Sequence, residues 1–126
     1  MINGLFQSQN DRAVRMMLEV AEAKQTAIAS NIANIETPGY RRVEVSKTFA
    51  DQLKKAIATG HTPPSGLKPA LTVDTHATSQ RADGNTVQLD RELLDMNKNS
   101  ADYEVLTQLA AGSFRLLKTA ITGRSL

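Results

Sequence analysis

At SNIANIETPGY, residues 30–40, a helical pattern ends and the chain turns. The residue before Pro38 is disfavoured in the helical region, so the helix is expected to stop there. Pro38 followed by Gly39 supplies the fixed φ and the positive φ that a type II turn requires. Asn31 and Asn34 lie near the helix end, where their amides can bond unpaired carbonyl groups or the returning chain.

Two interpretations of this stretch stay open from its residue types alone. An ordinary helix stop accounts for the proline and the glycine. It does not need two asparagines and a tyrosine, and that combination marks the stretch as a candidate assembly and turn motif. The residues of this turn motif are Asn31, Asn34, Thr37, Pro38, Gly39 and Tyr40.

Upstream of the turn motif, residues 10–35 show helical periodicity. Apolar side chains recur at spacings of four and three, which indicates one face of an amphipathic helix. The row consists of Val14, Leu18, Ala21, Gln25, Ile28, Ile32 and Ile35. Gln25 is either a tolerated polar residue or a buried amide that fixes helix register, as Asn can in coiled coils. The candidate interface residues of this helix are Val14, Leu18, Ile28 and Ile32.

A second long helix is predicted over residues 90–122. Its apolar residues form two adjacent rows, which are Tyr103, Leu106, Ala110, Phe114, Leu117 and Ile121, and Val105, Leu109, Leu116 and Ala120. The apolar arc is about 180° wide, whereas a two-stranded seam needs far less. We therefore expect other subunits to cover what one partner helix leaves exposed. The candidate interface residues here are Tyr103, Leu106, Leu109, Phe114, Leu117 and Ile121.

The middle segment, residues 41–85, is irregular. Residues 47–57 fit a short amphipathic helix, with Ser46 as its plausible N-cap. A loop rich in proline and glycine follows at 59–66, and residues 71–73 form a possible short strand. The predicted fold is therefore mainly α, with the two long helices paired as a coiled-coil-like layer and a small irregular region between them.

Composition limits the classes of function. The 126 residues include 15 Lys and Arg against 13 Asp and Glu, which does not argue for a nucleic-acid-binding face. The chain has no cysteine, so disulfides and thiolate metal sites are excluded. His61 and the pair Asp74 and His76 provide too few ligands for a stable metal site. With no catalytic or nucleotide-binding motif in the sequence, we expect a protein that is not an enzyme and has no metal or cofactor.

The charged residues are expected at the surface. Arg41-Arg42 and Lys54-Lys55 are interpreted as exposed basic pairs. The helical carboxylates are interpreted as solvated faces, and they are Glu19, Glu22, Asp90, Glu92 and Asp95. No apolar run approaches the roughly 18 residues of a membrane span, and residues 1–10 lack the pattern of a cleavable secretory signal.

The turn motif resembles the signature of bacterial flagellar rod and hook proteins, Asn-x-Ala-Asn-x-x-Thr-Pro-Gly-Tyr. Residues 83–90 resemble the segment before the last helix of the proximal rod family, FlgB type. The segments 103–109 and 114–121 resemble the C-terminal helix of that family. The resemblance covers both long helices, and residues 59–80 have no clear counterpart.

This resemblance implies a structural subunit at the proximal end of the flagellar basal-body rod. Residues 1–40 and 86–126 would form the inner layer of a periplasmic tube that carries torque and surrounds the export channel, with residues 41–85 outside it. The implied partners are other rod subunits of FlgC type, the adaptor FliE, the export gate and inner-membrane ring components, in homo- and hetero-oligomeric assembly after export through the flagellar type III apparatus. The alternative is a helical adaptor or export chaperone of a type III secretion system.

Overall fold

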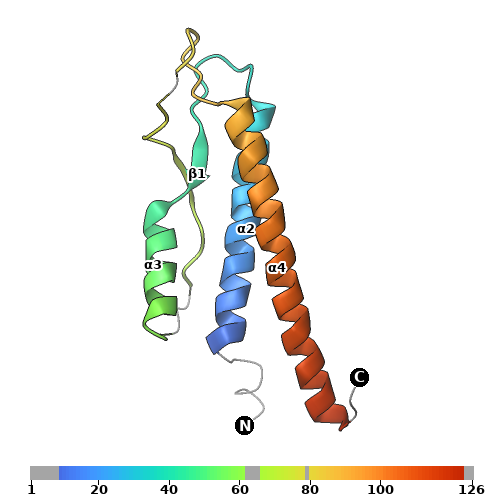
Figure 1. Ribbon diagram of the computed structural model, residues 1–126. Coiled ribbons are helices and arrows are strands. Elements are labelled where there is room, and N and C mark those ends of the chain that lie inside the picture. Colours follow the sequence, from blue (N-terminus) through green and yellow to red (C-terminus); the bar gives the residue numbers. More distant parts are fainter. Residues whose placement is uncertain (1–8, 62–65, 79, 124–126) are drawn as a thin grey trace.

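The computed structural model describes residues 9–61, 66–78 and 80–123. Helix α2 spans Gln9–Ala33 and helix α4 spans Leu89–Thr122. The two helices run antiparallel and side by side, close together near the turn after α2 and farther apart toward their other ends (Figure 1). The paired long helices of the predicted mainly α fold are therefore confirmed.

Helix α2 ends short of the point that its apolar row predicts. The backbone N–H of Ile35 donates to the carbonyl of Ile32 at 3.2 Å, and the N–H of Thr37 donates to the carbonyl of Asn34 at 3.0 Å. Hydrogen bonds of this i→i−3 kind tighten the end of a helix and satisfy carbonyls that have no α-helical partner. The last predicted turn is thus present but wound more tightly.

The turn after α2 has the predicted type II features. The N–H of Tyr40 donates to the carbonyl of Thr37 at 3.2 Å, and Gly39 adopts a φ of +74°. A positive φ at this position favours glycine. The N–H of Gly39 donates to the carbonyl of Asp83 at 2.8 Å, and a Cβ on Gly84 would lie 3.4 Å from the Cα of Gly39. The segment before α4 therefore packs closely against this turn.

The middle segment contains a small antiparallel sheet and one short helix. Strand β1 (Val43–Val45) pairs with strand β2 (Leu71–Val73), so that Val43 lies opposite Val73. Helix α3 (Lys47–Ala58) follows β1 directly and lies below it in Figure 1, and Ser46 holds its N-cap position without a side-chain capping hydrogen bond. The predicted strand and helix are both confirmed, while residues 62–65 of the predicted loop lie outside the described residues.

The interior is small and partly polar. Its buried apolar side chains are Ala21, Ala27, Ile28, Phe49, Leu53, Ala56 and Val87. The largest fully buried side chains are polar instead, and they are Glu92, Asn31 and Asn85. Buried polar groups are tolerated where hydrogen bonds replace those that water would make. The partners of these three side chains therefore decide how the elements fit together.

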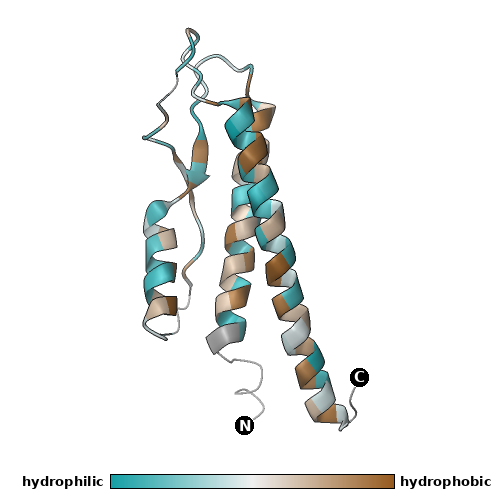
Figure 2. Cartoon of the chain, viewed as in Figure 1, coloured by the Kyte–Doolittle hydropathy of each residue, from teal (hydrophilic) through white to brown (hydrophobic). Residues whose placement is uncertain are grey.

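The lower half of α4 exposes apolar side chains, which alternate with polar ones along the helix (Figure 2). Val105 is 58% exposed, Phe114 69% and Leu116 74%. Burial of such a side chain is worth about 1.5–3 kcal/mol, so a protein that packed against this surface would gain binding free energy. None of the helices in the described part of the chain is long and apolar enough to cross a membrane.

Candidate assembly site

Asn31 joins the end of α2 to strand β1. Its Nδ2 donates to the carbonyl of Val43 at 2.9 Å, and the N–H of Val43 donates to Asn31 Oδ1 at the same distance. The side-chain amide thus pairs with both backbone groups of one residue, as a neighbouring strand would. Asn31 Nδ2 also donates to Glu92 Oε2 at 3.1 Å. The hydroxyl of Tyr40 donates to Asn31 Oδ1 at 3.4 Å and lies 2.9 Å from the Oγ of Ser30.

Asn34 and Thr37 make local contacts. Asn34 Nδ2 donates to the carbonyl of Ser30 at 2.9 Å, and Thr37 Oγ1 donates to Asn34 Oδ1 at 3.2 Å. The carbonyl of Ser30 belongs to the last turn of α2 and also accepts the backbone N–H of Asn34 at 3.1 Å. The two asparagines therefore divide the roles that the sequence allows, because Asn34 bonds the helix end and Asn31 bonds the returning chain.

Asn85 closes the end of α2 from the other side. Its Nδ2 donates to the carbonyls of Asn34, Ile35 and Thr37 at 3.0, 3.1 and 2.9 Å. Its Oδ1 accepts the N–H of Val87 at 2.8 Å. The sequence does not reveal this role of Asn85, because the carbonyls to which it donates lie about 50 positions upstream.

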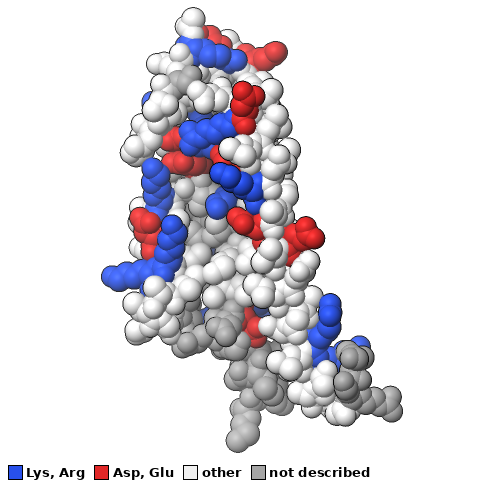
Figure 3. Space-filling view, viewed as in Figure 1, with Lys and Arg blue, Asp and Glu red and all other residues white. Residues whose placement is uncertain are grey.

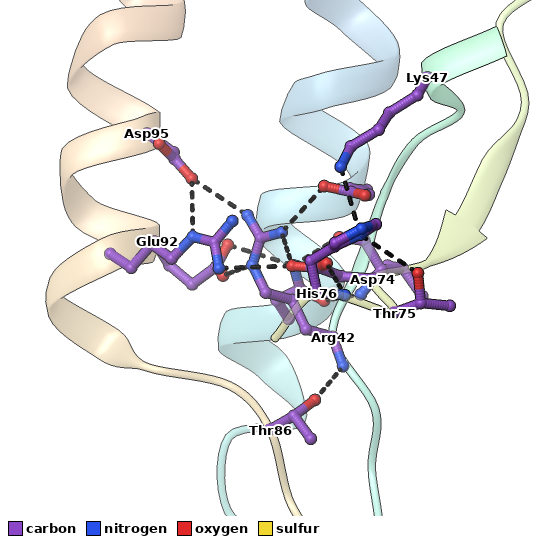
Figure 4. Close-up of polar contacts among 12 residues, drawn as sticks. Arg42, Lys47, Asp74, Thr75, His76, Thr86, Glu92 and Asp95 are labelled. Atoms are coloured by element: carbon purple, nitrogen blue, oxygen red, sulfur yellow. Dashed lines mark hydrogen bonds and ion pairs between the residues drawn. The ribbon is translucent and has the colours of Figure 1, made fainter. Parts of the chain in front are cut away.

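A buried ion cluster centred on Arg42 joins the middle segment to α4 (Figure 4). The Nε of Arg42 donates to Glu92 Oε1 at 2.5 Å, and Nη2 donates to Asp95 Oδ2 at 3.0 Å. Its Nη1 donates to Asp74 Oδ2 at 3.1 Å. Arg42 precedes β1 and Asp74 follows β2, whereas both other carboxylates come from α4. One guanidinium therefore fixes the sheet against the helix.

Ion pairing outweighs burial in this cluster. Burial alone would lower the pKa of Arg42, but hydrogen bonding to Glu92 and attraction to Glu92 and Asp74 raise it above its ordinary value. Burial would likewise raise the pKa of Asp74. The N–H of His76, donating at 2.9 Å, and the guanidinium groups of Arg91 and Arg42 instead lower the pKa of that carboxyl. Both groups are thus held in their charged forms.

Two expectations from the sequence are wrong at this cluster. Arg42 is not an exposed basic residue, because it is only 5% exposed. Glu92 is not part of a solvated face, because it is completely buried. Each is buried because the other neutralises it from 50 residues away, which local charge patterns do not reveal.

The histidine next to the cluster makes a turn contact. Asp74 and His76 do not share a strand face, because β2 ends at Val73 and the carboxylate of Asp74 accepts the N–H of His76 in a turn. Within the described ranges, no three or more His, Asp or Glu side chains are grouped so that they could hold a metal ion.

Gln25 is exposed, so the structure excludes the buried-amide interpretation of that residue. A buried amide between the two long helices is supplied by Asn99 of α4 instead. Its Nδ2 donates to the carbonyl of Ala21 at 2.9 Å and to Gln25 Oε1 at 3.3 Å. The sequence therefore pointed to the correct position along α2, but the buried amide there belongs to Asn99 of α4 and not to Gln25.

The candidate interface residues differ in burial. Ile28 is buried, and the half-buried ones are Val14, Leu18, Ile32, Leu106 and Leu117. The exposed ones are Tyr103, Leu109, Phe114 and Ile121, at 48, 55, 69 and 69%. Where α2 and α4 separate, Val14, Phe114 and Leu117 line a cleft of about 290 Å³. The far half of the helix pair is therefore incompletely packed within one chain.

Comparison with known proteins gives a consistent result. Residues 18–41, which include the turn motif, match the family described as "Flagella basal body rod protein". The flagellar basal body rod protein FlgB of Bacillus subtilis is 32% identical over 113 residues, covering 84% of this chain and 88% of that protein. FlgB of Salmonella typhimurium is 31% identical over 115 residues, covering 75% and 82%. FlgB of Escherichia coli is 29% identical over 125 residues, covering 83% and 89%.

Proposed function

The chain belongs to the FlgB family of flagellar basal body rod proteins, and from that premise we propose how it is built into the rod. It is a structural subunit of the flagellar basal body rod and assembles with other rod components. The alternative of a helical adaptor or export chaperone is not favoured by these relatives.

The proposal concerns the position of each part. Helices α2 and α4 form the inner layer of a tube around the export channel, and the segment between them faces outward. The subunit occupies the proximal end of the rod, where the neighbours are FlgC-type subunits, the adaptor FliE, the export gate and inner-membrane ring components. Family membership supports this arrangement, together with the pairing of the two helices in one chain.

The observation that carries the proposal is the set of uncovered apolar side chains on α4. Five large apolar side chains of its far half are more than half exposed, namely Val105, Leu109, Phe114, Leu116 and Ile121. Helix α2 cannot cover them, because the two helices separate toward that end (Figure 1). A neighbouring subunit that buried each side chain would gain about 1.5–3 kcal/mol per residue.

The turn motif has a different task in this proposal. Through Asn31, Asn34 and Tyr40, it sets the direction in which the chain leaves the inner layer. A rod subunit needs this direction to be the same in every copy, because neighbours contact both the helices and the middle segment. The proposed assembly residues are therefore the turn motif and the apolar positions of the helix pair.

Replacement of Leu109 by Asp tests the assembly face. A charge at this 55% exposed position should block incorporation into the rod, because a neighbour could not bury it, while the chain stays soluble. The measurement is the amount of the variant in purified basal bodies, with cell motility as a second readout. Gln108→Asp, at an exposed polar position on the same helix, should assemble normally. Normal incorporation of Leu109→Asp would refute the proposal.

A further inference from the structure

A groove of about 480 Å³ lies between α3 and the α2–α4 pair, beside the ion cluster. Figure 3 shows it as a depression whose α3 edge carries basic side chains. Its lining is mostly apolar in the middle, where Val20 and Ile28 of α2 face Val45, Leu53 and Ile57 of the middle segment. On its α4 side the groove continues into a cleft of about 310 Å³ that Val105 and Leu106 also line.

Three lysines from three different helices border the groove. They are Lys24 of α2, Lys54 of α3 and Lys98 of α4. All three are exposed, and none has an ion-pair or hydrogen-bond partner among the side chains of the described residues. Arg42 and Arg91 also line the groove, but their charges are already neutralised within the ion cluster. Lys47 also lines the groove but lies within hydrogen-bond distance of His76. The lining includes three carboxylates as well, of which Glu44 and Asp95 pair with Arg42 while Asp102 is exposed on α4. The remaining charge on the rim is therefore cationic on balance.

Asn99 supplies a second, independent feature. It lines the groove and is only 5% exposed. Its Oδ1 is buried and accepts no hydrogen bond from any residue that the structure describes. A buried acceptor without a donor costs free energy, so this side of the groove is not fully satisfied by the described chain alone.

We propose that this groove binds an amphipathic helix with acidic flanks, provided by a protein other than a copy of this chain. A helix places an apolar stripe about 100° wide on one side, which suits the apolar lining. Its flanking carboxylates then reach lysines on both rims, which gives the pairing that Lys24, Lys54 and Lys98 lack. The proposal does not depend on the place of the chain in the rod.

Charge argues against two other occupants. The uncovered stretch of α4 in a second copy, residues 103–122, carries Arg115 and Lys118 against one carboxylate, Glu104, so its net charge has the same sign as the rim. A bilayer surface would meet the lysines but could not enter a concave groove to reach the apolar lining. An amphipathic helix with acidic flanks can contact both the apolar lining of the groove and the lysines on its rim.

The test measures binding of fluorescent peptides to the full chain by fluorescence anisotropy. The probe is a designed helix of about 18 residues, or five turns, with leucines on one face and glutamates beside them. The control peptide has lysines in place of the glutamates. We expect the acidic peptide to bind, with an affinity that falls as salt is raised, and the basic peptide not to bind.

Charge reversal locates the binding site. The variant Lys24→Glu/Lys54→Glu/Lys98→Glu should bind the acidic peptide about tenfold more weakly and should gain binding to the basic one. The matched control reverses three lysines outside the groove, Lys55, Lys68 and Lys118, and should change the affinity less than about twofold. Circular dichroism checks that both variants keep native helicity. The single variant Lys54→Glu provides the same test, with a smaller loss, if the triple variant does not fold.

Three results would overturn the proposal. The first is equal binding of acidic and basic peptides, and the second is equal weakening by the groove variant and the control variant. The third is the absence of binding to the acidic peptide. If vesicles of anionic phospholipid bind in that case, the lysines belong to a membrane surface instead.

Discussion

The Nε of Arg42 donates to Oε1 of Glu92 at 2.5 Å, at a point where both side chains are shielded from water. The second oxygen of the same carboxylate accepts the amide of Asn31. A single side chain of α4 thus holds both the end of α2 and the beginning of β1. The pairing of the long helices and the position of the middle segment are therefore coupled through Glu92.

We predict that Glu92→Gln lowers the free energy of unfolding by about 3–5 kcal/mol, because Arg42 stays buried without its main counter-charge. Urea unfolding followed by circular dichroism measures this change. Glu104→Gln, at an exposed position on the same helix, should stay within about 0.5 kcal/mol of the wild type. Similar losses in both variants would show that the ion cluster does not stabilise the fold.

Acid should weaken the same cluster through Asp74. The pKa of this carboxyl is lowered in the folded chain, so its contribution is complete above the unfolded value of about 3.9 and is lost as pH falls through the folded pKa. In urea unfolding at a series of pH values between about 6 and 2, Asp74→Asn should show a flatter pH dependence than the wild type. Asp51→Asn, at an exposed site, should retain the wild-type slope.

Gly39→Val should strain the turn, because a β-branched residue strongly disfavours the φ of +74° found there. We expect a loss of about 2 kcal/mol in unfolding free energy and impaired rod assembly with export largely retained. Gly112→Ala is the control, since that glycine lies within α4 with open space around it, and it should stabilise the chain by about 1 kcal/mol. Normal motility and normal rods in Gly39→Val would remove the role assigned to the turn.

Asn85→Ala should remove one of the donors to three backbone carbonyls just after α2, together with the acceptor of the Val87 N–H. The expected loss is about 2–3 kcal/mol, because one fully buried side chain loses several hydrogen bonds at once, and the one to the Val87 N–H is itself buried. Asn97→Ala, at an exposed position of α4, has no such partners in the described chain and should change stability little. Thermal unfolding of both variants provides the comparison.

The two halves of α4 should differ in local stability when the chain is isolated. Amides in residues 103–122 are expected to exchange hydrogen faster than those in residues 89–100, because few buried contacts hold the far half in place. Hydrogen–deuterium exchange measured by mass spectrometry resolves the two regions. Uniform slow exchange along the helix would contradict the idea that neighbours complete this surface.

Local sequence patterns predicted the helices and the turn of this fold. The buried polar contacts depend on residues far apart in the sequence, and local patterns did not predict them. Apolar spacing indicated both long helices, and Pro38-Gly39 predicted the type II turn, because each signal lies within a few residues. Arg42 and Glu92 look like solvated charges in isolation. Their burial depends on a match between segments 50 positions apart, and no periodicity records such a match.

Asn85 shows the same limit on a smaller scale. An Asp-Gly-Asn sequence is a turn signal wherever it occurs, and the structure does place it in a loop. Only the folded chain shows that its amide reaches the backbone carbonyls of the turn directly after α2. The polar interior was therefore the part of this protein that sequence reasoning could not reach.

The dependence of α2 on Asn85 and Glu92 has a consequence for quality control. A ribosome makes α2 long before either of these residues exists. The turn after α2 therefore lacks its hydrogen bonds to Asn85 and Glu92 while the remaining chain is synthesised. A product truncated ahead of residue 85 keeps the turn motif but lacks the residues that lock it. Damaged or unfinished copies would thus lack the shape that their neighbours recognise, and the growing structure would exclude them without a separate inspection step.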